Sequence, residues 1–248
     1  MKSVTKKTKW FEEWFDSPFY HILYKDRDEK EAKDFILNLI NYLKPEQGSF
    51  FIDVACGKGR HSFFLNNLGY RVDGFDLSPN SIEAAKINES ESLHFYINDI
   101  RKPLNVNKYD YAFNLFTSFG YFDDESDNQL AINSIVESLT KDGILVLDFM
   151  NCNKAINNLT KLETKSVNNI DFNIIRNFSN GYITKDINFK NDGKSFHFQE
   201  KVKAISLNTF KFYFNIANLK IEAIFGDYKL NPFDMDNSDR LILIARKK

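Results

Sequence analysis

Two patterns of hydrophobic and polar residues follow one another along this chain. Between residues 50 and 149, short apolar runs alternate with segments whose apolar positions recur every three or four residues. This series predicts strands that alternate with helices, and therefore a mostly parallel, doubly wound α/β sheet. The expected strands cover residues 50–53, 69–76, 93–97, 109–114 and 143–149.

The helices of this region are marked by apolar faces and capping residues. Residues 28–43 carry six apolar side chains on one face and end before a proline, which predicts a helix that lies against the sheet. Ser78 followed by Pro79 is a helix start, and the helix is expected to reach residue 87. Further helices are expected over residues 124–139 and, from aromatic residues at helical spacing, over residues 10–15.

After Cys152 the pattern changes to alternation of single apolar and polar residues. The alternating segments are 170–178, 182–189 and 195–205. Asn-Gly and Asn-Asp-Gly sequences separate them and favour hairpin turns, so they predict an antiparallel β-lobe inserted after the fifth strand. Ser206 is expected to cap a helix over 206–218, although residues 210–214 also alternate as a strand would. The last strands are expected at 219–225 and 240–245.

The chain of 248 residues is long enough for one α/β domain with an insertion. Four parts follow from the patterns. They are a helical N-terminal lid with the first sheet-packing helix (1–46), the core (47–155), the β-lobe (156–205) and a C-terminal part that completes the sheet (206–248).

The loop after the first strand has the composition of a nucleotide-binding turn. Residues 53–59 read Asp-Val-Ala-Cys-Gly-Lys-Gly, and an amphipathic helix follows. Gly57 and Gly59 allow the backbone to approach a ligand closely, and the N–H groups of the next helix attract negative charge. The dinucleotide pattern G-x-G-x-x-G is not met, because its third glycine falls on Ser62.

This loop resembles the first motif of class I S-adenosylmethionine (SAM) dependent methyltransferases, and further strand ends follow at matching intervals. Asp76 ends the second strand, Asn98-Asp99-Ile100 the third, and Asn114 the fourth. The resemblance implies SAM as cofactor and a seven-stranded sheet whose last strand is antiparallel. It also implies the binding residues, which are Asp53, Ala55, Cys56, Gly57 and Gly59 for the methionyl part, Asp76 for the ribose, Leu77, Asp99 and Ile100 for the adenine, and Asn114 and Leu115 near the sulfonium.

Charge and composition narrow the partners of such an enzyme. The formal net charge is −1 and the pI is near 6.4, which disfavours a nucleic-acid substrate. The two cysteines and four scattered histidines show no metal-ligand spacing, so no metal is expected. No apolar stretch is long enough to span a membrane, and a cytoplasmic protein is expected.

The acceptor is expected to be a small metabolite, with oxygen, nitrogen, sulfur and a metalloid oxyanion all open as targets. The fourth strand leads into Asn-Leu-Phe-Thr, without the N-P-P-Y pattern or the Pro-Cys nucleophile that mark other methyltransferase classes. Candidate substrate-binding residues are Tyr20, Arg27, Phe119, Tyr121 and Glu200. Candidates for removing a proton are His21, Tyr24 and Tyr121. For Glu200 and Arg27 the alternative is a salt bridge at the surface.

Two functions of other classes remain open at the level of sequence. One is a SAM-binding regulatory or partner protein without catalysis, which would keep the cofactor motifs and lack an acceptor pocket. The other is a nicotinamide-dependent oxidoreductase, which would share Asp76 but needs the glycine pattern that this chain does not have.

Overall fold

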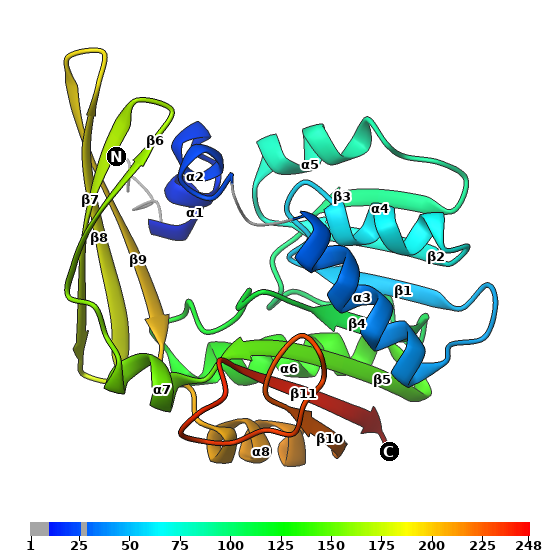
Figure 1. Ribbon diagram of the computed structural model, residues 1–248. Helices are drawn as coiled ribbons and strands as arrows, with labels where there is room; N and C mark the ends of the chain where they lie inside the picture. The colour runs from blue at the N-terminus through cyan, green and yellow to red at the C-terminus, as the bar shows by residue number, and fades with distance from the viewer. Residues whose placement is uncertain (1–9, 26–28) are drawn as a thin grey trace, which may run out of the picture.

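The computed structural model describes residues 10–25 and 29–248. Seven strands form one sheet in the order β10-β11-β5-β4-β1-β2-β3 (Figure 1). The strands are β1 (Phe50–Val54), β2 (Arg71–Asp76), β3 (Leu93–Ile97), β4 (Tyr109–Asn114), β5 (Leu139–Met150), β10 (Leu219–Phe225) and β11 (Arg240–Lys247). Only β11 runs antiparallel to its neighbours, β5 and β10. The predicted fold class is therefore confirmed.

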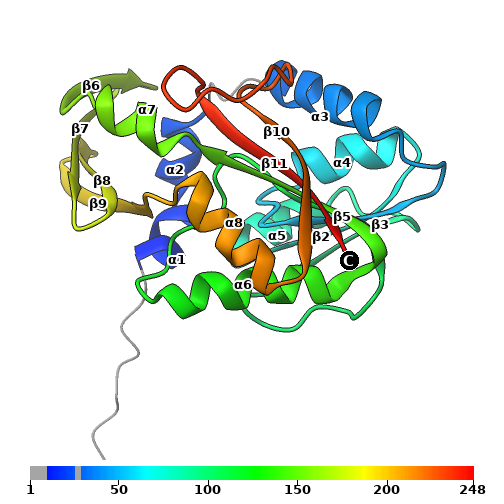
Figure 2. The same cartoon turned by 90° about the horizontal axis from the view of Figure 1, so that it is seen from below.

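Helices cover both faces of the seven-stranded sheet. The helices α3 (Glu29–Leu43), α4 (Arg60–Asn67) and α5 (Pro79–Lys86) contribute to one apolar cluster against the sheet. The helices α6 (Glu125–Ser138) and α8 (Leu207–Ile216) form another cluster on the opposite face, where Figure 2 shows them side by side. No helix of the described segments is long and apolar enough to cross a membrane.

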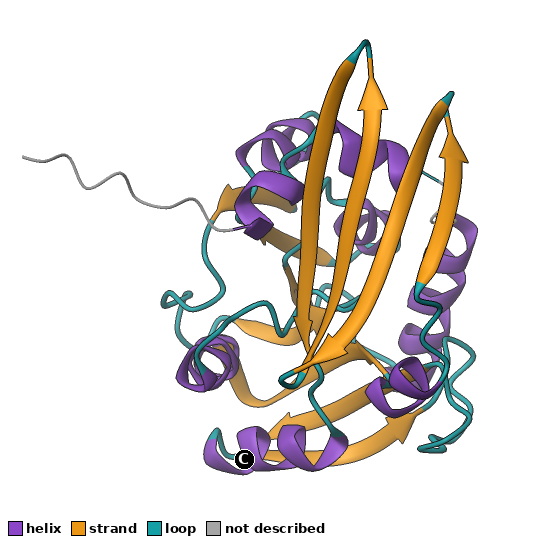
Figure 3. Ribbon diagram, turned by 90° about the vertical axis from the view of Figure 1, so that its left-hand side faces the viewer, coloured by secondary structure: helices purple, strands orange, loops and turns teal. Residues whose placement is uncertain are grey.

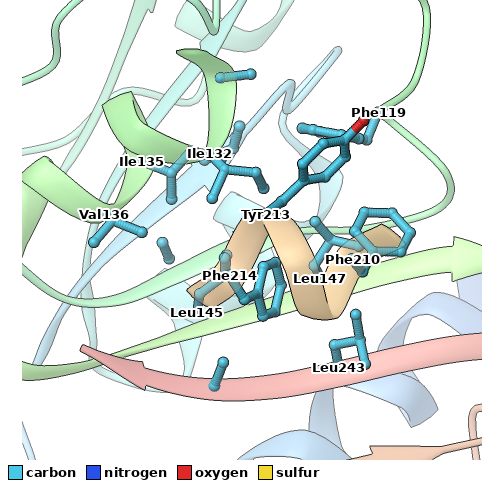
Figure 4. Close-up of a cluster of buried hydrophobic side chains, with 14 of the residues drawn as sticks. Phe119, Ile132, Ile135, Val136, Leu145, Leu147, Phe210, Tyr213, Phe214 and Leu243 are labelled. Carbon is cyan, nitrogen blue, oxygen red and sulfur yellow. The ribbon is translucent and has the colours of Figure 1, made fainter. Parts of the chain in front are cut away.

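Three aromatic side chains attach α8 to the sheet. Phe210, Tyr213 and Phe214 are buried and point toward α6, Leu147 of β5 and Leu243 of β11 (Figure 4). Burying each side chain of this size contributes about 1.5–3 kcal/mol. This contact explains why a segment that also alternates like a strand forms the predicted helix, because only the helix brings these three rings to one face.

The inserted lobe is a second sheet, sheet B, of four antiparallel strands in the order β6-β7-β8-β9 (Figure 3). They are β6 (Leu162–Val167), β7 (Ile170–Ser179), β8 (Tyr182–Asn191) and β9 (Lys194–Lys203). Two short helices, α1 (Trp10–Phe15) and α2 (Pro18–Leu23), pack on one face of this sheet through buried Trp14 and Leu23. In Figure 1 these helices lie between the lobe and the core.

The sequence prediction misses two elements and places the start of a third too late. The lobe has four strands rather than three, because β6 reads Leu-Glu-Thr-Lys-Ser-Val and, as an edge strand, leaves most of its side chains exposed. A short helix α7 (Cys152–Asn157), capped by the Asn151 side chain, precedes it and has too few residues for a recognisable period. In addition, β5 begins at Leu139 rather than at residue 143, since Leu139 pairs with Tyr109.

Candidate functional site

A cavity of about 760 Å³ lies where the carboxyl ends of β1, β2 and β4 meet α1, α2 and β9. A volume of this size is typical of small-molecule and cofactor sites. Core and lobe both contribute to its lining. The position agrees with the general rule that open α/β sheets bind ligands outside the carboxyl ends of their strands.

The loop after β1 presents its backbone to this cavity. Ala55 and Gly57 both have positive φ angles, 58° and 56°, and both line the cavity together with Cys56. A side chain at Gly57 would meet no atom within 4 Å, so the space in front of this residue is open to a ligand. Burial raises the pKa of the Cys56 thiol, which therefore stays protonated and is not a nucleophile.

Two acidic side chains are fixed beside this loop. Asp76 accepts hydrogen bonds from the backbone N–H of Gly57 and of Ser78, each 2.9 Å long. Burial nevertheless raises the pKa of Asp76. Asp53 is buried too, accepts a 2.6 Å hydrogen bond from Ser62 Oγ, and has a pKa raised to about 6 by burial. Both residues line the cavity.

The predicted adenine-binding residues lie along one wall of the cavity. Leu77, Asp99 and Ile100 all contribute to the lining, together with Leu115 after β4. Asp99 accepts hydrogen bonds from Nε and Nη2 of Arg101, at 3.0 and 2.5 Å, which fix its carboxylate. Arg101 in turn pairs with Asp127 of α6 at 2.6 Å. This wall is therefore apolar with one oriented carboxylate at its edge.

Gly59 and Asn114 are not among the residues that line this cavity. Gly59 has φ 80°, and a Cβ atom there would lie 2.6 Å from the ring of Phe95, so glycine is needed for close packing against β3. Asn114 is buried and donates hydrogen bonds to the carbonyl oxygens of Val54, at 3.0 Å, and Ser118, at 3.2 Å. It ties the end of β1 to the turn after β4, a role inside the core.

A buried carboxylate that the sequence analysis does not single out organises the turn after β4. Asp148 of β5 accepts hydrogen bonds from the Phe116 N–H at 2.7 Å and from Nε of Arg240 at 2.8 Å. Phe116 and Thr117 have positive φ angles of 59° and 61°, which are unfavourable for side-chain-bearing residues. Arg240, which lines the cavity, also donates to Thr117 Oγ1 at 2.9 Å. These contacts hold the turn in its strained conformation.

The Phe116 ring is covered by a buried histidine. His61 stacks on it with ring centroids 5.0 Å apart and an angle of 13° between the planes. Burial and the neighbouring Arg60 charge lower the pKa of His61 to about 3. His61 is therefore neutral at physiological pH, and it lines the cavity.

Aromatic side chains from α1, α2 and the turn after β4 line the other end of the cavity. Trp10 and Phe15 contact Tyr121 with ring centroids 5.5 and 5.2 Å apart, and Tyr20 lies 5.1 Å from Phe15. Phe119 also lines the cavity and packs on Phe210 of α8. The predicted candidates Tyr20, Phe119 and Tyr121 are thus brought together.

Among the residues that line the cavity, Glu200 of β9 supplies the carboxylate that the lobe contributes to this aromatic end. Its Oε1 accepts hydrogen bonds from Nε1 of Trp14 at 2.7 Å and from the hydroxyl of Tyr24 at 2.6 Å. Its Oε2 lies 3.7 Å from Nζ of Lys185. The two hydrogen bonds to Oε1 orient the carboxylate of Glu200, which lines the cavity.

The three candidates for proton removal all line the cavity but differ in chemistry. The Tyr24 hydroxyl donates to Glu200, and the Tyr121 hydroxyl donates to the carbonyl oxygen of Thr117. Burial and the charge of Lys58 lower the pKa of His21, which leaves its imidazole neutral at physiological pH. Arg27, a candidate for substrate binding, lies outside the described residues.

The donor set at the core end fits the cofactor that the sequence implies. Asp76 offers a fixed carboxylate to hydroxyl groups, Leu77 and Ile100 form an apolar wall beside it, and Gly57 leaves its backbone accessible. Within residues 10–25 and 29–248, no three His, Cys, Asp or Glu side chains are grouped as metal ligands would be.

Comparison with known proteins identifies the family of this chain. A family model described as a methyltransferase domain matches residues 45–201, which is more than half of the chain. The Bacillus subtilis protein YqeM, whose name assigns it provisionally to the methyltransferases, is 30% identical over 107 residues. The aligned residues make up 42% of this chain and 43% of YqeM, so the match spans less than half of that relative.

Solved structures share the architecture over nearly the whole chain. A SAM-dependent methyltransferase from Clostridium acetobutylicum ATCC 824 has a TM-score of 0.77 at 19% identity and covers 92% of this chain and 96% of its own. CalS10, an amino pentose methyltransferase from Micromonospora echinaspora solved with SAM bound, has a TM-score of 0.72 at 16% identity, with coverages of 94% and 98%. The family match argues against the nicotinamide-dependent oxidoreductase. The chain belongs to the class I SAM-dependent methyltransferases, with an antiparallel β insertion.

Proposed function

We propose that this methyltransferase acts on a small molecule that binds in the same cavity as SAM, beneath α1, α2 and the sheet-B lobe. One observation carries the proposal. A single cavity is lined at its core end by the predicted cofactor residues and at its other end by the aromatic side chains and Glu200. When bound, SAM supplies a methyl group already activated by the positive charge of its sulfonium.

We assign the cofactor contacts residue by residue. Asp76 would bind the ribose hydroxyls, and Leu77, Asp99 and Ile100 would enclose the adenine. The backbone from Ala55 to Gly57, with Asp53 behind it, would hold the methionyl part, and Leu115 would lie near the sulfonium. Gly59 and Asn114 support this end of the cavity from the core, without contacting the ligand.

The contribution of the chain to the reaction is positioning and exclusion of water. Trp10, Phe15 and Tyr121 close the cavity over the turn after β4, and their ring contacts leave an apolar surface around the reacting atoms. Holding a donor and an acceptor in line supplies several kcal/mol of the barrier reduction in reactions of this type.

The acceptor atom that the site favours is an amine nitrogen. Oε2 of Glu200 offers an acceptor for an N–H group, and the faces of Tyr20 and Tyr121 attract a cation. The likeness to CalS10, whose name states an amino pentose acceptor, supports this choice. An ammonium group must lose a proton before it attacks, and the neutral imidazole of His21 is the candidate to receive it.

Both cysteines are free and buried, which agrees with a protein of the reducing cytoplasm. We place the activity there. The formal net charge of −1 and the enclosed aromatic cavity favour a metabolite over a nucleic acid as substrate.

Calorimetric titration with SAM and S-adenosylhomocysteine tests the cofactor half of the proposal. Wild type should bind both, and Asp76→Ala should weaken binding by about tenfold or more, because a charge-assisted hydrogen bond is lost. A folded wild-type protein that binds neither would refute the assignment.

The acceptor half is tested by measuring S-adenosylhomocysteine release on pairs of compounds that differ only in an amine or a hydroxyl at one carbon. Amines should react, and Glu200→Gln should reduce kcat/KM by about tenfold without changing SAM affinity. Glu222→Gln, on the exposed strand β10, is the matched control. SAM binding without turnover on any acceptor would favour a regulatory SAM-binding protein, and equal rates on amines and alcohols would refute the amine assignment.

A further inference from the structure

A second hollow, of about 650 Å³, lies on the lobe next to the first cavity. It is bordered by sheet B, by Ala155 of α7 and by the residues that follow that helix. Met150, Glu200 and Val202 line both spaces. These three side chains are therefore the common wall, and a molecule that reaches past them would occupy both spaces.

Four charged side chains cross sheet B along this hollow, one from each strand. They are Glu163, Arg176, Lys185 and Glu200. The strand register places Arg176 directly opposite Lys185, and Lys185 directly opposite Glu200. Like charges at directly opposed positions repel one another, so the pair of cations requires negative charge nearby.

Each cation already has one carboxylate on its outer side. Arg176 pairs with Glu163 and donates to the carbonyl oxygen of Thr160 at 3.3 Å. Lys185 donates to the Tyr24 hydroxyl and lies 3.7 Å from Oε2 of Glu200, a longer distance than in a direct hydrogen bond. The side chains of Arg176 and Lys185 are only 22% and 14% exposed, so both charges are largely withdrawn from water.

The rest of this sheet face shows how side chains pack where their role is structural. Farther along the same strands, Phe172, Ile174 and Ile187 are buried beneath α1 and α2, and Lys165, opposite Phe172, donates to the carbonyl oxygen of Leu23 at 3.1 Å. Apolar residues usually stabilise such positions at least as well as ion pairs, because burying charge costs desolvation energy. Arg176 and Lys185 instead line a hollow, where a polar ligand can reach them.

We propose that the second hollow binds an oxyanion carried by the acceptor, a phosphate monoester or a carboxylate, between Arg176 and Lys185. The inference rests on the proposed function, because the atom to be methylated then lies in the first cavity near Glu200. If Glu200 receives the amine of the same molecule, that amine adds a positive charge to the row, and the oxyanion offsets it. The methyl acceptor is accordingly a molecule with an amine at one end and an oxyanion at the other.

Thermal unfolding in the presence of simple anions tests the second hollow without knowledge of the acceptor. The protein is saturated with S-adenosylhomocysteine, and sodium phosphate or sodium acetate is compared with sodium chloride at equal ionic strength. An anion at about tenfold its dissociation constant should raise the wild-type Tm by about 3 °C. A larger response to phosphate identifies a phosphate ester, and a larger response to acetate identifies a carboxylate.

Variants locate the response. Lys185→Gln and Arg176→Gln should each lose most of the shift, measured against their own Tm in chloride, whereas Lys190→Gln, on an exposed position of β8, should keep it. Two variants are used so that one remains informative if the other does not fold. No response in wild type, or an equal response in all variants, would overturn the proposal. Failure of S-adenosylhomocysteine to bind would instead refute the proposed function. The Tm in each anion would then be measured without S-adenosylhomocysteine.

Discussion

The two ends of the cavity are built from different parts of the chain. At the core end, the contacts come from backbone turns and short side chains that follow neighbouring strands, such as Asp76 on the N–H groups of Gly57 and Ser78. At the lobe end, side chains from distant segments meet, and the hydrogen bond from Trp14 to Glu200 joins residues 186 positions apart. Local chain geometry therefore fixes the core end, and long-range packing fixes the lobe end.

The turn after β4 lies between these two ends. Leu115 and Phe116 face the core end, and Phe119 and Tyr121 belong to the aromatic end. Asp148 and Arg240 hold this turn from behind. Substitutions at the turn should therefore affect both ends, whereas substitutions on either side should affect only one.

The largest effect is expected for Asp148→Ala. It leaves the Arg240 guanidinium largely buried without its carboxylate and removes the acceptor for the Phe116 N–H, so the free energy of unfolding should fall by about 4 kcal/mol. Urea unfolding measures the loss. The control is Glu222→Ala, which removes an exposed carboxylate from Arg246 and should cost less than about 1 kcal/mol. Equal losses in the two variants would show that Asp148 does not hold the turn.

The next effect separates packing from ligand contact within one loop. Gly59→Ala forces a Cβ atom to 2.6 Å from the Phe95 ring at φ 80° and should lower the free energy of unfolding by about 3 kcal/mol. Gly57→Ala has a similar φ but open space, so it should cost only about 1 kcal/mol and instead weaken SAM binding. Unfolding curves and calorimetry on both variants give the comparison. The reverse assignment of the two effects would contradict the geometry.

A third effect concerns pH at the core end. The pKa of His61 is about 3 in the folded protein, below its ordinary value of 6.5, so the unfolded chain binds the proton more readily. Stability is therefore lost as pH falls below 6.5, by about 2 kcal/mol at pH 5. His61→Gln should remove this part of the dependence, and His94→Gln, on an exposed position of β3, should not. Unfolding free energies at pH 7 and pH 5 test this, and parallel losses in wild type and His61→Gln would contradict it.

The same difference between the two ends explains how much could be predicted from the sequence. The alternation of strands and helices and the hairpin turns were predictable because each depends on neighbouring residues. The lining role of Asp76 was predictable because the carboxyl ends of parallel strands meet at one edge of the sheet. Strand β6 was not, since an exposed edge strand needs no apolar face.

Residues with similar sequence patterns have different roles in the structure. Gly57 and Gly59 belong to one motif, yet only Gly57 lines the cavity. Gly59 packs instead against the ring of Phe95 on β3. The pairing of Asp148 with Arg240 joins residues 92 positions apart, and nothing in the intervening sequence indicates it. The charged row of the lobe depends on strand register, which alternation alone does not specify.

The smallest expected effect tests whether the two ends are coupled through the lid. Asp16, between α1 and α2, accepts hydrogen bonds from Ser78 Oγ at 2.5 Å and from Nδ2 of Asn80 at 2.7 Å, although it does not line the cavity. Asp16→Ala should therefore cost less than about 1 kcal/mol of stability, because the contact is partly exposed.

Its consequence should appear at both ends of the cavity. The amides of α1 and α2 should exchange faster with solvent, and SAM affinity should fall by about threefold, because a cofactor bound beneath the lid escapes more readily. Asp16→Asn keeps one oxygen for the Ser78 hydroxyl and should lie between the two. Faster exchange in Asp16→Ala with unchanged SAM affinity would show that α1 and α2 affect the lobe end alone. The two ends would then be independent of each other, although they share one cavity.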